Sequence, residues 1–406
     1  MQKILIIGKI WPEPTSSAAG TRILQLIDLF VQKKYAVTFA STASKSEHSY
    51  VFDTNIVSEK TIKLNDASFS TFIENLKPDI VLFDRFMTEE QFGWQVREIC
   101  PEALVILDTE DLHFLREART FAYKKDQLLH LHTLLAKREI ASILRCDLSL
   151  MISKVEIDLL INEFKVPKHI LLYLPFLEDT SSLSHVKLKD FNHRSNFVFI
   201  GNYLHEPNYQ TLLTLKKEIW PILSKKLPTA ELHIFGAYAT QKVTQLHNIK
   251  ERFIIKGRAE DARETLANYK VLLAPIPFGA GLKGKFVDAM FSGTPSITTP
   301  MGAEGMYFHK IWNGYVTDKN DIMIEKAQAL YQDSILWKEA QQKGFIISKD
   351  IFDKDKFSQI FWKTFNQIKD NLESHRQRNF MGEILKINQL NSHKYMSLWI
   401  EVKNKS

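Results

Sequence analysis

The sequence predicts an α/β protein of two doubly wound, Rossmann-like domains that face a central cleft. Short apolar runs, suited to strands buried on both faces, alternate with helical patterns in each half of the chain. The alternation stops at a polar stretch and begins again near residue 197. Since strands that alternate with helices pair in parallel, each series predicts its own sheet. We therefore divide the chain into an N-terminal domain (1–176), a linker (177–195), a C-terminal domain (196–370) and an extension (371–406) of unknown role.

The expected elements follow the chain in order. Ser153 with Glu156 three residues later has the pattern of a capping box, which predicts a helix start. In the N-terminal half, strands are expected at 3–8, 35–41, 80–83, 104–107 and 148–152, and helices at 23–30, 89–100 and 124–145. In the C-terminal half, strands are expected at 197–201, 231–235, 253–256, 271–274 and 295–299, and helical patterns at 321–346 and 354–371.

The composition is that of a folded soluble protein. Of the 406 residues, 45% are hydrophobic and 25% charged, and no apolar run reaches the roughly 18 residues that span a bilayer. The start of the chain lacks a signal-peptide pattern. The two cysteines, Cys100 and Cys146, are too far apart for a CxxC motif, which fits a reducing compartment and argues against structural zinc. We therefore expect a cytoplasmic protein.

The net charge of +6 is open to two interpretations. It is either that of an ordinary basic enzyme or a sign of attraction to phosphate groups on a nucleotide or a lipid. Because no run of five basic residues and no nucleic-acid motif occurs, a nucleic-acid partner is not expected. The basic residues of the helix expected at 124–145 could touch a membrane surface, although a solvated face explains their scatter better.

The strongest functional signal is the glycine-rich loop after the strand expected at 271–274. Gly279 and Gly281 allow backbone N–H groups to approach an anion, and the following helix contributes its positive N-terminal end. Lys283 and Lys285 are unfavourable there for the helix alone, but a bound diphosphate would offset that cost. Asp288, one turn further on, could accept hydrogen bonds from ribose hydroxyls. A glycine-rich turn with solvated lysines is the alternative.

Other candidates follow predicted strands. His113, beside Asp108 and Asp111, could act as a base or contact a reacting sugar, although the segment could also only start a helix. Its carboxylates do not have the spacing of a metal-binding DxD element, so no metal is expected. Gly20 and Arg22 close the first strand–helix loop. Strand-end turns supply the remaining residues of the expected cleft, Gly201, Asn202, Gly257 and Arg258.

No cofactor is expected. The spacing from Gly8 to Gly20 is not GxGxxG, and no acidic residue ends the second strand, which argues against a dinucleotide.

These residues resemble glycosyltransferase family 4, whose members have the GT-B fold. The segment GAGLKGKFVDAMFSGTPSITTP resembles the family's donor-binding segment, and residues 199–202 with Pro207 and Asn208 resemble the start of its C-terminal domain. Residues 108–117 resemble the segment that carries its active-site histidine, here His113. The resemblance spans roughly residues 1–370. It implies retaining transfer of a sugar from a nucleotide-diphosphate donor, bound by the C-terminal domain, to a glycan or lipid-linked acceptor.

The sequence departs from the family pattern at two places. Many members carry two glutamates eight positions apart, and those positions are Ala280 and Asp288 here; Asn202 stands where an arginine often follows the first strand of the C-terminal domain. We therefore expect Lys283, with Lys285 and Arg258, to neutralise the diphosphate. The family analogy further suggests surface-polysaccharide or glycoconjugate synthesis at the inner face of the membrane. A GT-B-fold nucleotide-sugar epimerase and a non-catalytic homologue are the alternatives.

Overall fold

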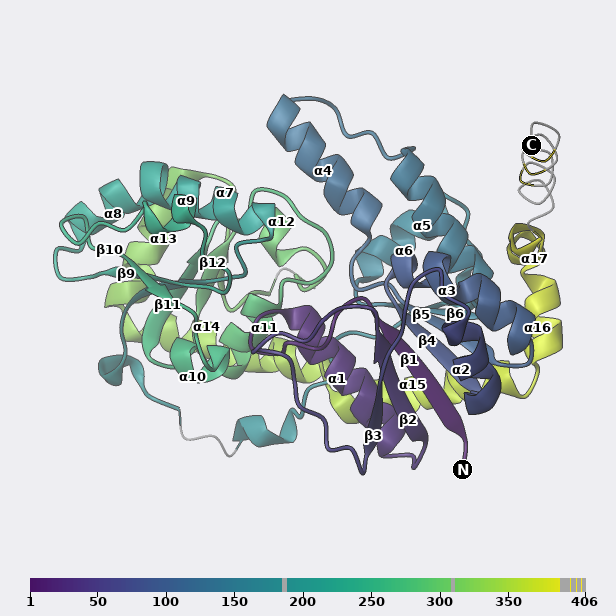
Figure 1. The fold of residues 1–406 in the computed structure, drawn as a ribbon. Helices are drawn as coiled ribbons and strands as arrows, with labels where there is room; N and C mark the ends of the chain where they lie inside the picture. The colour runs from purple at the N-terminus through teal and green to yellow at the C-terminus, as the bar shows by residue number, and fades with distance from the viewer. Residues whose placement is uncertain (185–187, 308–310, 388–394, 396–398, 400–402, 404–406) are drawn as a thin grey trace.

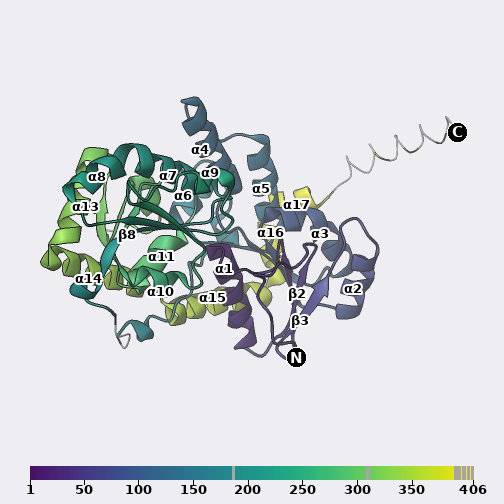
Figure 2. The same ribbon diagram turned by 60° about the vertical axis from the view of Figure 1, so that its left-hand side comes forward.

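The computed structural model contains two parallel β-sheets with helices on both faces, which confirms the predicted α/β class (Figure 1). The structure describes residues 1–184, 188–307 and 311–387, together with Tyr395, Trp399 and Lys403. The two sheets belong to the two halves of the chain, which lie beside each other in both views (Figures 1 and 2). No helix in the described ranges is long and apolar enough to cross a membrane.

The N-terminal sheet has seven parallel strands in the order β3-β2-β1-β4-β5-β6-β7. The strands are β1 (Lys3–Gly8), β2 (Ala36–Ser41), β3 (Val57–Thr61), β4 (Ile80–Asp84), β5 (Leu104–Asp108), β6 (Leu148–Met151) and β7 (Leu171–Tyr173). The central strands β4 and β5 are buried along their whole length, as their unbroken apolar runs predict. The strand order reverses between β1 and β4, which opens a crevice at their carboxyl ends.

Helices cover both faces of this sheet. Its helices are α1 (Ala18–Val31), α2 (Ser68–Leu76), α3 (Phe86–Ile99), α4 (His113–Lys125), α5 (Leu134–Arg145) and α6 (Lys154–Asn162). Helix α1 packs on one face through Ile23, Leu26 and Phe30. Helices α2 to α6 pack on the other face.

The C-terminal sheet repeats the plan with six parallel strands in the order β10-β9-β8-β11-β12-β13. Its strands are β8 (Ser195–Ile200), β9 (Leu232–Phe235), β10 (Phe253–Gly257), β11 (Tyr269–Ala274), β12 (Ser296–Thr298) and β13 (Gly314–Val316). Its helices are α7 (Glu206–Thr214), α8 (Trp220–Lys226), α9 (Gln241–Thr244), α10 (Ala262–Leu266), α11 (Gly284–Phe291), α12 (Pro300–Ala303), α13 (Asn320–Gln332) and α14 (Ser334–Ile351). A π-helical turn, Leu215–Ile219, joins α7 to α8.

Two expected helices are interrupted. The prediction of one continuous helix at 124–145 was wrong. Helix α4 ends at Lys125, and Asp126 adopts a left-handed conformation (φ 49°). Helix α5 begins only at Leu134, where the Thr133 side chain caps the N–H of Ala136. The pattern at 321–346 divides at Asp333, whose carboxylate accepts the first N–H groups of α14. In both places a polar side chain satisfies helix-end N–H groups that a longer helix would have bonded internally.

The end of the chain returns to the N-terminal domain. Helix α15 (Lys354–Lys369) packs Phe361 and Phe365 against Phe30 of α1, so residues 354–369 belong to the N-terminal core rather than to the C-terminal domain in which we expected them. Helices α16 (Leu372–Arg378) and α17 (Phe380–Lys386) continue along the same domain, where Arg376 pairs with Asp147. The yellow ribbon of Figure 1 follows this return. The extension expected at 371–406 is described over 371–387 and at Tyr395, Trp399 and Lys403; its other residues lie outside the described residues, as do 185–187 of the linker.

Candidate functional site

A cavity of about 680 Å³ lies between the two domains. Its N-terminal wall comes from the loops after β1, β4 and β5, and its C-terminal wall from the segments after β8, β9, β10 and β11. These are carboxyl ends of parallel strands, where open α/β sheets bind ligands. The cavity contains most of the predicted site residues: His113, Asp111, Gly201, Asn202, Arg258, Gly279, Lys283, Lys285 and Asp288.

Contacts around the cavity hold the domains together. Arg119 of α4 pairs with Glu304, with an Nη1–Oε2 distance of 2.6 Å, and also donates to the carbonyl oxygen of Gly279 at 2.7 Å. On the opposite side, Arg258 donates to the Ser16 hydroxyl at 2.8 Å. Because these bonds cross from one domain to the other, they join the two walls of the cavity.

The glycine-rich loop uses its glycines to approach the N-terminal domain closely. Gly281 has φ 59°, and a Cβ atom there would lie 2.7 Å from the Cβ of Asp111. A Cβ at Gly284 would lie 2.5 Å from that of Ala18. Gly281 itself is turned away from the cavity, and its N–H donates to the Glu156 carboxylate at 2.7 Å. The loop therefore presents Gly279, Lys283 and Lys285 to the cavity, whereas Gly281 joins the domains.

The two lysines lie at the start of α11 without an ion-pair partner among the described residues. The Lys283 ammonium donates to the carbonyl oxygen of Gly281 at 2.9 Å, and that of Lys285 donates to Asn208 Oδ1 at 2.6 Å. Burial lowers the pKa of Lys283 to about 8. Burial, with the neighbouring charge of Lys283, lowers the pKa of Lys285 to about 7. The charges of nearby carboxylates, Glu304 above all, oppose the fall at Lys283, but none of them forms an ion pair with either ammonium group among the described residues.

Asp288 lies on the cavity wall, and one of its two carboxylate oxygens is hydrogen-bonded to the protein. Its Oδ1 accepts a hydrogen bond from Nε of Arg263 at 2.9 Å, and the same guanidinium reaches Glu178 at 2.9 Å. Burial raises the pKa of Asp288, while Arg263 opposes that rise. The second carboxylate oxygen has no protein partner among the described residues, which fits the predicted contact with ribose hydroxyls.

His113 is the first residue of α4, and both its backbone N–H and its ring contact the buried side chain of Glu139. The carboxylate of Glu139, which is fully buried, accepts the backbone N–H groups of His113 and Phe114 at 3.0 and 2.9 Å, a favourable place for negative charge at a helix start. Nδ1 of His113 lies 3.1 Å from the carbonyl oxygen of Asp111 and 3.3 Å from Glu139. Since both neighbours are acceptors, Nδ1 carries the proton and Nε2 remains for a ligand in the cavity.

Three predicted acceptor-side residues lie outside the cavity, so their predicted role was wrong. Arg22 and Asp108 are completely buried and form an ion pair at 2.8 Å, while Arg22 also donates to the carbonyl oxygen of Pro175 at 2.7 Å. Gly20 packs against the backbone of Glu13, which would lie 2.4 Å from a Cβ atom. These residues support the cavity wall from behind. Asp111, in contrast, lines the cavity and pairs with Arg116 at 2.6 Å.

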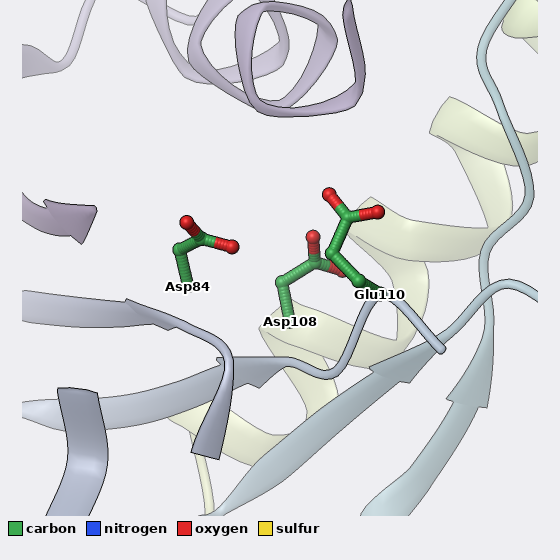
Figure 3. Close-up of side chains that lie close together, drawn as sticks. All are labelled: Asp84, Asp108 and Glu110. Carbon is green, nitrogen blue, oxygen red and sulfur yellow. The ribbon is translucent and has the colours of Figure 1, made fainter. Parts of the chain in front are cut away.

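Three carboxylates gather at the N-terminal wall, those of Asp84, Asp108 and Glu110 (Figure 3), and Glu110 is the one that lines the cavity. Asp84 and Asp108 are paired neighbours at the ends of β4 and β5, and Glu110 follows on the next loop. One oxygen from each lies within 4.8 Å of the others. Burial and the charge of Asp108 raise the pKa of Glu110 to about 8. Arg22 on Asp108 and Arg85, 3.7 Å from Asp84, already provide positive charge here.

The sequence analysis missed several residues of the cavity. The N-terminal wall carries Lys9, Arg85 and Arg116, and His205 faces them from the C-terminal wall. Lys9 and Arg85 directly follow strands β1 and β4, so the position after a strand was a signal that could have found them. Arg116 lies within α4, and its approach depends on the tertiary fold.

Comparison with solved structures identifies the class of fold. The structure is similar to sucrose-phosphate synthase from Thermosynechococcus elongatus, with a TM-score of 0.65 and 12% identity over 91% of this chain and 99% of that one. It is similar to TarM with a TM-score of 0.67 and 11% identity, over 90% of this chain and 99% of that one. Anabaena Alr3699/HepE, solved with UDP and glucose, gives a TM-score of 0.64 and 13% identity over 90% of this chain and 100% of that one. The protein therefore has the GT-B fold of glycosyltransferases.

Sequence comparison points to the same class. Residues 194–333 match the family model described as Glycosyl transferases group 1, a segment that contains the glycine-rich loop and Asp288. The chain is also 25% identical over 224 residues to an uncharacterized 44.6 kDa protein in the cps region of Klebsiella pneumoniae. That match covers 53% of this chain and 55% of the relative, so the chain spans about half the length of the curated relative it matches.

Proposed function

We propose that this protein is a glycosyltransferase of family 4 that transfers a sugar from a nucleoside-diphosphate donor to a glycan or lipid-linked acceptor. The observation that carries the proposal is the position of Lys283 and Lys285, at the start of α11 and on the wall of an interdomain cavity, with no acidic partner among the described residues. The match of residues 194–333 to Glycosyl transferases group 1 supports it. So does UDP in the structurally similar Alr3699/HepE.

In this proposal the C-terminal wall binds the donor. The diphosphate lies between the Lys283 and Lys285 ammonium groups and the N-terminal end of α11, and Arg258 adds positive charge at the edge. Asp288 accepts hydrogen bonds from the ribose through the oxygen that Arg263 does not use. Charge that develops on the leaving diphosphate is then met by groups already in place, which is how preorganised sites lower a barrier.

The N-terminal wall positions the reacting sugar and the acceptor. His113 contacts the donor sugar through Nε2, because Glu139 and Asp111 hold Nδ1. Closure of the two domains over the substrates would exclude water from the reacting carbon. We expect retention of configuration by family analogy. Ala280 brings no carboxylate to the position where many members have a glutamate, so the reaction depends more heavily on the lysines.

We further propose that the reaction needs no bound metal. In metal-dependent transfer a divalent cation neutralises the diphosphate, and here Lys283, Lys285 and Arg258 occupy the wall where that charge is required. In the carboxylate cluster of the N-terminal wall, Arg22 is bonded to Asp108, and Arg85 lies 3.7 Å from Asp84. We expect the chelator EDTA to leave the transfer rate unchanged.

The biological setting proposed is synthesis of a surface polysaccharide or glycoconjugate in the cytoplasm, with peripheral contact to the membrane. The relative in a cps region supports the polysaccharide setting. Leu128 and Leu129 between α4 and α5, and Leu134 at the start of α5, are exposed apolar side chains that follow Lys124 and Lys125 in the chain, and we propose that they enter the headgroup region.

A ligand panel followed by a transfer assay tests the function. Thermal shift with nucleoside diphosphates and their sugars identifies the base, because a ligand at 100 times its Kd adds about 2.7 kcal/mol of stability. The best donor is then incubated with and without a cell extract, and with and without EDTA. Transfer only with the extract supports the proposal. Turnover of the donor alone to an isomer identifies an epimerase, and binding without transfer identifies a non-catalytic homologue.

A further inference from the structure

Three cationic side chains gather on the N-terminal wall of the cavity. Lys9 follows β1, Arg85 follows β4 and Arg116 lies in the first turn of α4. They are close enough for their charges to interact, since burial and the charges of Arg85 and Arg116 lower the pKa of Lys9. Lys283 and Lys285 lie on the other wall, so a second positive region faces the first one across the cavity.

Two of these cations have no hydrogen-bond partner for their side chains in the part of the chain that the structure describes. The Lys9 ammonium is exposed in the cavity, and the Arg85 guanidinium comes no nearer than 3.7 Å to the carboxylate of Asp84. The side chain of Arg85 is only 14% exposed. The pair with Asp84 is long and supplies no hydrogen bond, so the N–H groups of this withdrawn guanidinium remain for a charged ligand.

The neighbouring acids meet this need only in part. Asp84 lies 3.7 Å from the Arg85 guanidinium, and its other oxygen accepts the backbone N–H of Lys9 at 3.2 Å. Asp108 is bound by Arg22 and Asp111 by Arg116. Glu110 is 8% exposed, and its Oε1 is buried without a hydrogen-bond partner. Burial and the charge of Asp108 raise the pKa of Glu110, which favours its neutral form. The Lys9 ammonium and the guanidinium N–H groups of Arg85 therefore face the cavity without a hydrogen bond to any of these acids in the described part of the chain.

The backbone of this wall is also strained. Arg85 has φ 70° and ψ 154°, a combination that only glycine adopts without cost, and Glu110 has φ 59°. The N–H of Arg85 donates to the carbonyl oxygen of Asp108 at 2.8 Å, which holds the turn. Strain of this kind persists where surrounding structure fixes it, and it is found mostly at binding and catalytic sites.

We propose that Lys9, Arg85 and Arg116 bind a phosphate group on the acceptor, so that the acceptor is a phosphorylated molecule rather than a neutral glycan. The inference rests on the proposed function, because it assigns the acceptor half of the same cavity. Three cations on one wall, of which only Arg116 makes a hydrogen-bonded ion pair, suit a phosphate, which carries nearly two negative charges, better than a single carboxylate. The arginine forks match phosphate oxygens in pairs, and the lysine adds a point charge.

Binding of simple phosphorylated probes tests the proposal. The full chain is saturated with the nucleoside diphosphate that stabilises it most, and then titrated calorimetrically with farnesyl diphosphate, farnesol, glucose 6-phosphate or glucose. We expect one phosphorylated probe to bind at least tenfold more tightly than its neutral counterpart. The lipid and sugar pairs distinguish a lipid-linked acceptor from a phosphorylated glycan.

Variants decide which wall binds the probe. Lys9→Ala and Arg85→Gln should each weaken the phosphorylated probe about tenfold and leave nucleoside-diphosphate affinity unchanged, whereas Lys63→Ala, an exposed lysine outside the cavity, should change neither. The proposal is overturned if phosphorylated and neutral probes bind equally well. It is also overturned if Lys9→Ala and Arg85→Gln leave the affinity for the phosphorylated probe unchanged. Such a result with intact nucleotide binding leaves the proposed donor site standing, whereas loss of nucleotide binding by the unmodified protein overturns that site instead.

Discussion

Glu156, in the first turn of α6 of the N-terminal domain, accepts a hydrogen bond from the backbone N–H of Gly281 in the C-terminal domain at 2.7 Å. The same Oε1 accepts the N–H of Leu112 at 3.3 Å, while Oε2 is buried without a partner. One carboxylate thus ties the glycine-rich loop to the segment that precedes His113. It sets the distance between the two walls of the cavity.

This contact predicts a pH-dependent stability. Burial and the charge of Asp111 raise the pKa of Glu156 to about 8, against 4.5 for an ordinary glutamate. Between those two values the folded protein retains a proton that the unfolded chain has released, so stability falls as pH rises through this window. Glu156→Gln should remove on the order of 2 kcal/mol of that fall between pH 5 and pH 8. Urea unfolding at several pH values measures it.

Glu74→Gln, at an exposed position on α2, is the matched control and should leave the pH profile unchanged. Glu110 has a similarly raised pKa, so the stability of the Glu156→Gln variant should still fall in part as pH rises. A variant whose profile parallels that of the unmodified protein would show that Glu156 is ionised in the folded state.

Lys283 should dominate binding of the diphosphate. Lys283→Ala removes a charged hydrogen-bond donor from the start of α11 and should weaken a nucleoside diphosphate by about 2 kcal/mol, roughly thirtyfold. Calorimetric titration measures the loss, with Lys250→Ala, an exposed lysine far from the cavity, as the control. An affinity equal to that of the unmodified protein would contradict the assignment of the loop.

The same two lysines predict how donor binding depends on pH. Their pKa values are lowered to about 8 and about 7, so each loses its charge as pH rises through those values. Since the diphosphate favours the charged forms, affinity should fall about tenfold between pH 7 and pH 9, and binding should take up protons. Titration in buffers of different ionisation enthalpy measures the uptake. No net proton uptake near pH 8 would mean that the lysines do not face the diphosphate.

The fold and much of the donor site could be predicted because their signals are local. Strand runs, the glycine-rich loop and Lys283 are neighbours in sequence, and the strand ends necessarily meet at one edge of a parallel sheet. The contact that Glu156 makes could not be predicted from its neighbours in the sequence. Its pattern with Ser153 predicted a capping box, and α6 does begin at Lys154, but the Ser153 side chain makes no capping bond and Glu156 binds Gly281, 125 residues away.

Arg22 illustrates the opposite error. The sequence placed it in a loop beside the acceptor, but its position in α1 turns it into the core, where Asp108 and the carbonyl oxygen of Pro175 surround it. No pattern in the sequence distinguishes an arginine that faces a cavity from one buried beneath it. The packing of α15 on the N-terminal domain could not be predicted for a similar reason. The sequence shows that α15 has an apolar face, but not which domain that face packs against.

The buried ion pair predicts an effect on stability rather than on substrate binding. Arg22→Met leaves the Asp108 carboxylate buried without its partner and should cost roughly 3–5 kcal/mol of unfolding free energy. Arg22→Met combined with Asp108→Asn should recover part of the loss, because no lone charge then remains. Urea unfolding measures both. If the Arg22→Met protein were as stable as the unmodified protein and had a raised KM for the acceptor, Arg22 would instead contribute to acceptor binding.

Arg263 should position the ribose-binding carboxylate. Its guanidinium joins Asp288 in the cavity to Glu178, at the point where the linker pairs with Asp353. Arg263→Ala frees Asp288 to turn away and should weaken donor binding about tenfold, near 1.4 kcal/mol, while Arg263→Lys keeps part of the affinity.

A ligand series separates this effect from that of the phosphate loop. Nucleoside, nucleoside monophosphate and nucleoside diphosphate share the ribose, so Arg263→Ala should weaken all three by the same factor, whereas Lys283→Ala should weaken the diphosphate most. Lys256→Ala, an exposed substitution in β10 of the same domain, is the control. If the Arg263 loss instead grew with each added phosphate, Arg263 would act on the diphosphate, and Asp288 would not be the group that holds the ribose.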